Sequence, residues 1–245
     1  MIGGFIITGN QPKPVVLRGM GPSLISAGIP ADAVLLDPVI ELRGASGALI
    51  VSNDNWKESP QRAQIEGTIF QPTDDREAVI LATLPPAAYT VILRGANDTS
   101  GIGLVEIYDN NSALDSELAN ISTRGFVQTG NEVMIGGFVL GGNSNPTNIA
   151  VRARGPSLSS YGLSPVLADP TLELHNADGT IMISNDDWES DPVSAAELTA
   201  HGLALSDPKE AGIFTALAPP GQFTAIVAGK NGDIGIALVE IYNVK

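Results

Sequence analysis

The chain lacks cysteine altogether, and this absence removes several classes of protein from consideration. Its 245 residues hold no cysteine and two histidines, His175 and His201. Without thiols the chain has no disulfide framework, no zinc–thiolate site and no thiol nucleophile. The missing cysteines do not by themselves identify the compartment in which the protein works.

Basic residues and long apolar runs are also scarce. Lysine and arginine number 13 against 27 aspartates and glutamates, for a formal charge of −14. Such a field repels phosphate backbones, so we expect no nucleic-acid partner. No apolar run reaches the roughly 18 residues that indicate a membrane-spanning helix, so we expect no membrane span. No basic and apolar leader opens the chain, so we expect a secretion signal to be absent or already removed.

Catalytic motifs are missing as well. The sequence has no Ser-His-Asp order, no Gly-x-Ser-x-Gly, no His-Glu-x-x-His and no phosphate-binding loop. Both histidines lie in the second half, where neither matches a histidine of the first. Carboxylate pairs are abundant, so counting alone does not exclude a glycosidase. We nevertheless expect a protein that is not an enzyme.

What the chain does contain is a hairpin sequence that occurs twice. LLDPVIELRGASGALIVSNDNW occupies 35–56 and LADPTLELHNADGTIMISNDDW occupies 167–188. Matching segments extend the duplication over nearly the whole chain, with positions 37 and 169 separated by 132 residues and positions 18 and 152 by 134. This period is too long for a solenoid and long enough for a separate core. The sequence predicts two homologous domains, 1–115 and 116–245.

The local patterns within each repeat indicate strands. Residues 39–43 alternate between two faces, which is the period of a half-buried strand. Gly47 and Gly179 supply turn residues that tolerate a positive φ. About seven short strands per repeat, separated by turns, are typical of an antiparallel β-sandwich. The predicted fold class is all-β, with two homologous antiparallel, jelly-roll-like β-sandwich domains in tandem.

The connector between the repeats predicts one strand more than the symmetry requires. Residues 121–129 read as a strand, and no equivalent precedes Met1. One domain therefore holds a strand that its twin lacks, and the twin should expose a sheet edge or pair it with another chain. The alternative interpretation is a chain cut from a longer array. The predicted assembly edge comprises Ile2, Phe5, Ile7, Phe126 and Val127.

Oxygen-bearing side chains gather where the second strand of each hairpin ends. Calcium takes several carboxylate and carbonyl oxygens, so these turns predict a calcium site as the cofactor. The spacing of an EF-hand is absent, and either Asp37 or Asp169, or the later Glu77 or Glu210, would join the Asn-Asp turns as further ligands. The alternative is that the same side chains cap a tight turn through their own backbone. The candidate ligands are Asp37, Asn53, Asp54 and Asn55 in the first repeat and Asp169, Asn185, Asp186 and Asp187 in the second.

Two further pairs are candidate binding residues. Arg18 and Arg152 precede a Gly-Pro turn in each repeat, where they would clamp a ligand carboxylate or form a structural pair with a glutamate or aspartate. Trp56 and Trp188 are the two tryptophans, one in each repeat. A surface tryptophan suits stacking on a sugar, whereas a tryptophan after a strand more often fills a core.

The hairpin resembles the bacterial pre-peptidase C-terminal domains, small β-sandwich modules appended to secreted enzymes. The matching residues are Asp-Pro at 37, Glu-Leu at 41, Gly47 and Asn-Asp at 53, followed by Pro-Ala-Ala-Tyr-Thr at 86–90. The second repeat matches at the equivalent positions. The whole pattern is also similar to tandem modules of uncharacterised, secreted, multi-domain bacterial proteins. The Gly-Pro-Ser-Leu segments at 21 and 155 depart from the pre-peptidase type.

The resemblance implies an extracellular or cell-surface location and a structural, adhesive or accessory role. We expect a non-enzymatic extracellular protein that assembles head to tail into filaments by strand exchange at an open sheet edge. Its partners would then be further copies of itself. The alternative prediction is a calcium-dependent module that binds an extracellular glycan as the accessory domain of a secreted enzyme.

Overall fold

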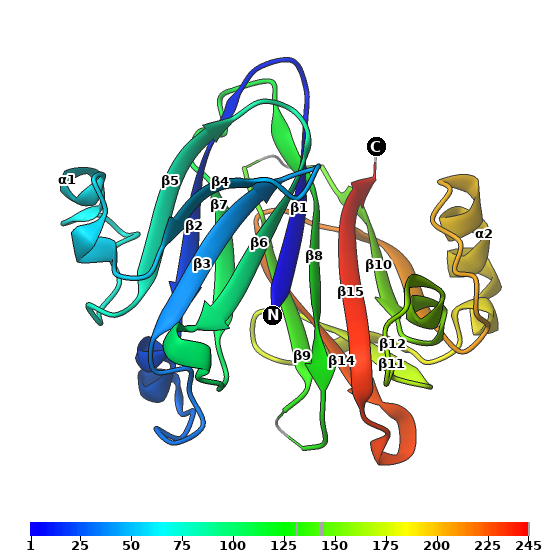
Figure 1. The fold of residues 1–245 in the computed structure, drawn as a ribbon. Helices are drawn as coiled ribbons and strands as arrows, with labels where there is room; N and C mark the ends of the chain where they lie inside the picture. Colours follow the sequence, from blue (N-terminus) through cyan, green and yellow to red (C-terminus); the bar gives the residue numbers. More distant parts are fainter. Residues whose placement is uncertain (131, 143–144, 245) are drawn as a thin grey trace. The chain divides into compact units, whose positions relative to one another are not determined.

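The fold is built almost entirely from antiparallel strands, as Figure 1 shows, and the predicted all-β class is confirmed. The computed structural model describes residues 1–130, 132–142 and 145–244. The chain divides into two compact units, Met1–Ala119 and Asn120–Lys245. No helix in the described part of the chain is long and apolar enough to cross a membrane.

The first unit contains two antiparallel sheets. One has the order β4-β3-β6-β1, formed by Leu49–Asn53, Pro38–Gly44, Ala88–Gly95 and Ile2–Thr8. The other has the order β5-β2-β7, formed by Ala78–Leu84, Lys13–Met20 and Leu104–Asp109. A 3-10 helix, Pro22–Ala27, follows β2, and the short helix α1 spans Arg62–Ile65.

The second unit repeats this arrangement and adds a strand. One sheet has the order β12-β11-β14-β9, formed by Ile181–Asn185, Pro170–His175, Gly221–Gly229 and Met134–Leu140. The other has the order β13-β10-β15-β8, formed by Ala211–Leu217, Thr147–Arg154, Gly235–Val244 and Glu117–Val127. Helix α2 spans Pro192–Ala200. In the described residues β8 pairs with β15, whereas β7, the counterpart of β15, pairs with β2 alone.

The core of each unit lies between its two sheets and follows from the alternation along the strands. In β10, Ile149 and Val151 enter the core that the two sheets of the second unit share. Ala150, between them, points to the opposite face and packs against Trp188. Because successive side chains in a strand alternate between faces, β10 buries apolar residues on both sides. The second sheet of each unit is therefore the middle of three layers.

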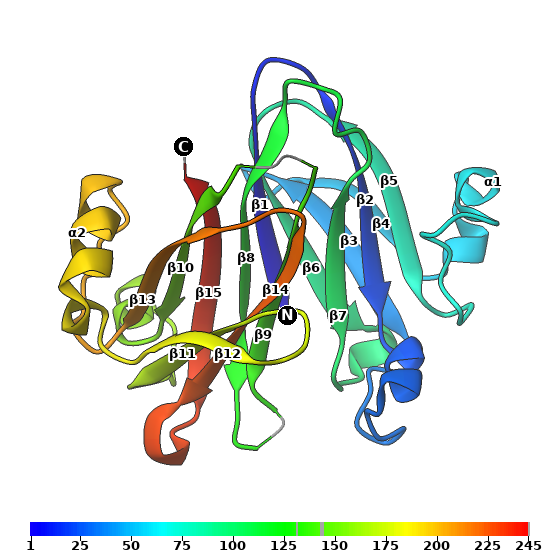
Figure 2. The same ribbon diagram turned by 180° about the vertical axis from the view of Figure 1, so that it is seen from behind.

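The third layer comes from the segment that precedes β5 in the first unit and β13 in the second. In the first unit, Trp56 and Ile65 pack with Val16 and Val79 on the outer face of the β5-β2-β7 sheet. In the second unit, α2 contributes Leu198 to the matching cluster. Figure 2 shows α1 beside β5 and α2 beside β13. The segment 57–76 contains α1 in this layer.

The glycine of each Gly-Pro-Ser-Leu segment is required by close contact with the backbone. A Cβ atom on Gly21 would lie 1.9 Å from the carbonyl oxygen of Leu35, and one on Gly155 would lie 2.1 Å from that of Leu167. No side chain fits at these distances, so the loop would have to move away from the segment that leads into the hairpin. The repeated glycine is therefore a packing requirement.

Replacing this glycine should destabilise the first unit selectively. We expect Gly21→Ala to lower its unfolding free energy by about 2 kcal/mol or more, because steric overlap must be relieved by backbone movement. Gly44→Ala is the matched control, since its Cβ would meet the side chain of Ile50 at an ordinary 3.7 Å. Urea denaturation followed by tryptophan fluorescence measures both, and equal effects of the two substitutions would contradict the prediction.

Candidate assembly interface

A buried glutamate joins the two repeated motifs of the first unit. The carboxylate of Glu77 is fully buried and accepts hydrogen bonds from the backbone N–H groups of Gly21 (3.0 Å) and Ser23 (2.8 Å). The Ser23 hydroxyl donates a further hydrogen bond to it. The backbone carbonyl of Glu77 accepts from the N–H of Trp56 at 2.9 Å. One residue therefore ties the Gly-Pro-Ser-Leu loop to the Asn-Asp-x-Trp turn.

The second unit reproduces this arrangement with Glu210. Its carboxylate accepts from the N–H groups of Gly155 (3.0 Å) and Ser157 (3.1 Å) and from the Ser157 hydroxyl (2.5 Å). Its carbonyl accepts from the N–H of Trp188 at 2.8 Å. The glutamates considered as calcium ligands are thus used to satisfy buried donors of their own unit.

The asparagines of the predicted calcium site also bond to the backbone. The Asn53 amide donates to the carbonyl of Asn55 at 3.1 Å, and its oxygen accepts from the N–H of Val79 at 2.9 Å. Asn185 makes the equivalent bonds, to the Asp187 carbonyl (3.1 Å) and from the Gly212 N–H (2.9 Å). This is the capping role that the alternative interpretation describes.

The remaining candidate ligands are dispersed. The Asp186 carboxylate pairs with the Lys230 amine at 2.7 Å, and the Asp54 side chain is exposed. Asp37 and Asp169 accept hydrogen bonds through their backbone carbonyls, from the N–H groups of Ala96 and Lys230. Over the described residues, no three carboxylate, imidazole or thiol side chains gather as a metal site would need. Calcium binding stays a prediction of the sequence.

The two candidate arginines form ion pairs within their own sheets. Arg18 meets Glu106 at 3.0 Å, and Arg152 meets Glu240 at 2.6 Å. Tyr242 donates to the same Glu240 carboxylate at 2.9 Å. Burial raises the pKa of the Tyr242 hydroxyl to about 12, and the negative charge of Glu240 adds to the shift. These arginines therefore hold structural pairs, and neither guanidinium is presented to a ligand.

Both tryptophans belong to the interior. Trp56 is 1% exposed and Trp188 is 8% exposed. Neither ring offers a face that could stack on a sugar at the surface. The tryptophan after each hairpin instead anchors the third layer to the sheet beneath it.

Most of the residues predicted for the assembly edge are buried in the cores of their own units. Phe5, Ile7 and Val127 are at most 2% exposed, because their side chains point between the sheets of their own units. Ile2 is half-buried, and only Phe126 of this group presents its side chain to solvent. The predicted edge is therefore not a continuous apolar surface. The physical reason is that side chains alternate between the two faces of a strand, and a short apolar run does not show which of them face inward.

The structure exposes apolar strands elsewhere, at β4 and β12. Each ends its sheet and, in the described residues, pairs on one side only, with β3 and β11. A bulge interrupts both pairings at the same place. The exposed side chains are Leu49 (52%), Ile50 (49%) and Val51 (38%) in β4 and Ile181 (51%) and Met182 (44%) in β12. The sequence signal for these exposed apolar strands was the run Leu-Ile-Val in β4 and the run Ile-Met-Ile in β12.

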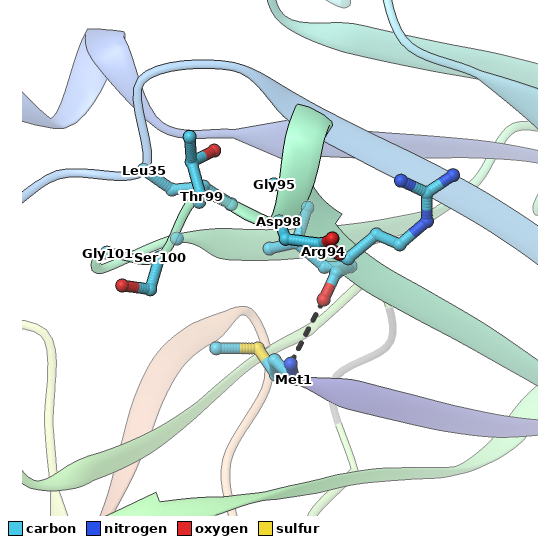
Figure 3. Close-up of a pocket in the computed structure, with 10 residues that line it drawn as sticks. Met1, Leu35, Arg94, Gly95, Asp98, Thr99, Ser100 and Gly101 are labelled. Atoms are coloured by element: carbon cyan, nitrogen blue, oxygen red, sulfur yellow. Dashed lines mark hydrogen bonds between the residues drawn. The ribbon is translucent and has the colours of Figure 1, made fainter.

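An open hollow of about 350 Å³ lies in the first unit. Figure 3 shows its lining, with the Met1 amine donating to the carbonyl of Leu93 at 3.0 Å. The described side chains around it include Arg94, Asp98 and Thr99, and the Thr99 hydroxyl donates to a backbone carbonyl. Its described lining residues assemble no nucleophile with a neighbouring base.

A smaller hollow of about 210 Å³ lies beside the hairpin turn of the second unit and includes His175. Both ring nitrogens of this histidine are engaged, one with the Gly179 carbonyl and the other with the Glu173 carboxylate, each at 2.9 Å. The Gly179 carbonyl, followed by Glu173, raises the pKa of His175. The imidazole is held as part of the turn and is not aimed at a substrate.

Substitution of Glu77 tests its role as a buried acceptor of hydrogen bonds. We expect Glu77→Ala to lower the unfolding free energy by about 3 kcal/mol or more, since it leaves buried N–H groups without an acceptor. Ser23→Ala, which removes one donor and keeps both backbone bonds, should cost about 1 kcal/mol. Urea denaturation measures the two variants, and an equal loss from both would show that the backbone bonds to Glu77 matter little.

No family model matches the chain, and no curated protein is similar to it in sequence. Solved structures give distant likenesses. The major capsid protein P2 of bacteriophage PM2 has 10% identity and a TM-score of 0.26, over 100% of this chain and 93% of that protein. PNGF-II has 8% identity and a TM-score of 0.26, over 96% and 57%. VP2 of the infectious bursal disease virus subviral particle has 10% identity and a TM-score of 0.21, over 98% and 58%. Similarities this low carry no argument about function.

Proposed function

We propose that this chain is a non-enzymatic structural protein that assembles with further copies of itself through exposed edges of its sheets. The observation that carries the proposal is the pair of apolar edge strands, β4 and β12, which occupy equivalent places in the two units. Following the resemblance of the hairpin to modules of secreted bacterial proteins, we place this assembly outside the cell.

The two strands lack the charged residues and prolines that commonly protect a sheet edge. An edge strand presents unpaired N–H and C=O groups, and proteins commonly blunt it with lysine, proline or inward-pointing charge. The sequences of β4, Leu-Ile-Val-Ser-Asn, and β12, Ile-Met-Ile-Ser-Asn, contain no charge and no proline. The shared bulge bends each strand, so we propose contact mainly through the apolar side chains. Covering each half-exposed side chain contributes about 1 kcal/mol.

The charges next to the two edges favour pairing of unlike strands. Beside β4, Arg43 and Arg94 both contact the Glu41 carboxylate, which leaves a net positive charge. Beside β12, the carboxylates of Glu173 and Asp178 leave a net negative charge even when His175 is protonated. Unlike edges therefore attract and like edges repel.

Contact between β4 of one copy and β12 of the next joins different surfaces. A contact of this kind generates a filament when its repetition does not close by rotation. The proposed assembly is therefore head to tail. The buried tryptophans give no support to the alternative prediction of glycan binding.

A lysine in the apolar contact should stop assembly, because the cost of burying its charge there exceeds the attraction between the two edges. We expect parent protein to form filaments in negative-stain electron microscopy, and Ile50→Lys or Met182→Lys to remain monomeric in sedimentation velocity. Ile69→Lys is the control, since Ile69 is 84% exposed and belongs to neither edge strand.

A mixture of the two edge variants tests the pairing of unlike strands. Ile50→Lys keeps an intact β12 and Met182→Lys keeps an intact β4, so an equal mixture should form a dimer that neither variant forms alone. A parent protein that stays monomeric at every concentration would overturn the proposed function. Dimers in one variant alone would overturn the pairing of β4 with β12.

A further inference from the structure

The last strands of the two units share a sequence but differ in their surroundings. Leu-Val-Glu-Ile-Tyr occurs in β7 at 104–108 and in β15 at 238–242. The strand β15 lies between β10 and β8, whereas β7, over the described residues, has a partner only in β2. The protein therefore contains an occupied and an unoccupied copy of one sheet edge.

Burial of the side chains reports the same difference. Val239 and Ile241 in β15 are 1% and 4% exposed, whereas their counterparts in β7, Val105 and Ile107, are only half-buried. In the second unit, Ile121 of β8 packs against the core beside them. Within the described part of the chain, the first unit thus keeps two partly exposed apolar residues at the place where its twin has a covering strand.

The backbone of β7 is also oriented to accept a strand. Asn110 directly follows β7, and its backbone N–H donates a hydrogen bond of 3.0 Å to the carbonyl of Pro14 in strand β2. Backbone groups of alternate residues point to opposite sides of a strand. The N–H and C=O groups of Val105 and Ile107 therefore point away from β2, toward the side on which no described strand pairs with β7.

The second unit shows what fits this edge. Strand β8 runs antiparallel to β15, with Ile121 opposite Ile241 and Thr123 opposite Val239. The backbone carbonyl of Ile241 also accepts a hydrogen bond from the side-chain amide of Asn120 at 3.0 Å. The fitting segment thus has a β-branched apolar residue at one core-facing position and a smaller β-branched residue two positions later.

We infer that the β7 edge is an acceptor site for a separate extended segment with the pattern of β8. The segment adds antiparallel to β7, with an apolar β-branched residue opposite Ile107 and a small or β-branched one opposite Val105. The chain's own β8 does not fill the site, since it pairs with β15. Main-chain bonds supply the affinity and the two core-facing side chains the selectivity, as in other cases of strand addition. This site is independent of the β4 and β12 contact.

The test uses a labelled synthetic peptide with the sequence of residues 117–128, ELANISTRGFVQ, and the intact chain. We expect saturable binding at a ratio of one to one in fluorescence anisotropy, with amide shifts concentrated in β7 by NMR. Val105→Pro should weaken binding by about tenfold or more, since it removes an outward donor. A peptide with Thr123→Pro should fail to bind the parent protein, which keeps the test independent of the folding of any protein variant.

The repeat supplies a matched control for the protein variant. Val239→Pro makes the same change in β15, where β8 pairs with that residue, so it should lower the melting temperature. Val105→Pro should leave the melting temperature near that of the parent, because proline is tolerated at an edge whose N–H faces solvent. Equal destabilisation by the two substitutions would show that the β7 edge is already occupied, and would overturn the inference.

Three other outcomes would also overturn it. The first is absence of peptide binding, and the second is binding that Val105→Pro leaves unchanged. The third is a concentration-dependent dimer of the parent protein that Val105→Pro abolishes, which would make β7 of a second copy the occupant. Ile50→Lys should bind the peptide as the parent does, so a failure of the filament proposal remains distinguishable from a failure of this one.

Discussion

The buried carboxylate of Glu77, with Glu210 as its counterpart, is the interaction on which the rest of each unit depends. Its side chain satisfies the donors of the Gly-Pro-Ser-Leu loop, and its backbone holds the tryptophan turn. The loop follows the second strand and the turn follows the hairpin, so one residue connects the two sheets and the outer layer. An unsatisfied buried donor is costly, so these parts form together.

Because both units contain this glutamate interaction, they differ chiefly at the edges of their sheets. The interior of each unit repeats the same strands, the same glutamate and the same ion pair between arginine and glutamate. Edges are less constrained, because an edge strand is held from one side only. Our proposals accordingly rest on edge strands of the sheets, namely β4, β12 and β7, and not on a cleft.

The sequence was most reliable where a residue pattern had a single physical explanation. Residues 39–43 were predicted as a half-buried strand and lie within β3, and the pairing of Arg18 with a glutamate was one of the two interpretations of that arginine. It was least reliable at Phe5 and Ile7. A short apolar run signals a strand without saying which side chains face inward, and these two fill the core.

The sequence by itself determined the repeat, the all-β class and the presence of one strand more than the symmetry requires. These follow from local alternation, turn residues and self-similarity, which are properties of the chain alone. Only the tertiary structure decided that β7 is the strand left uncovered and that Glu77 is an internal acceptor. Both depend on contacts between residues far apart in the chain, which no local pattern specifies.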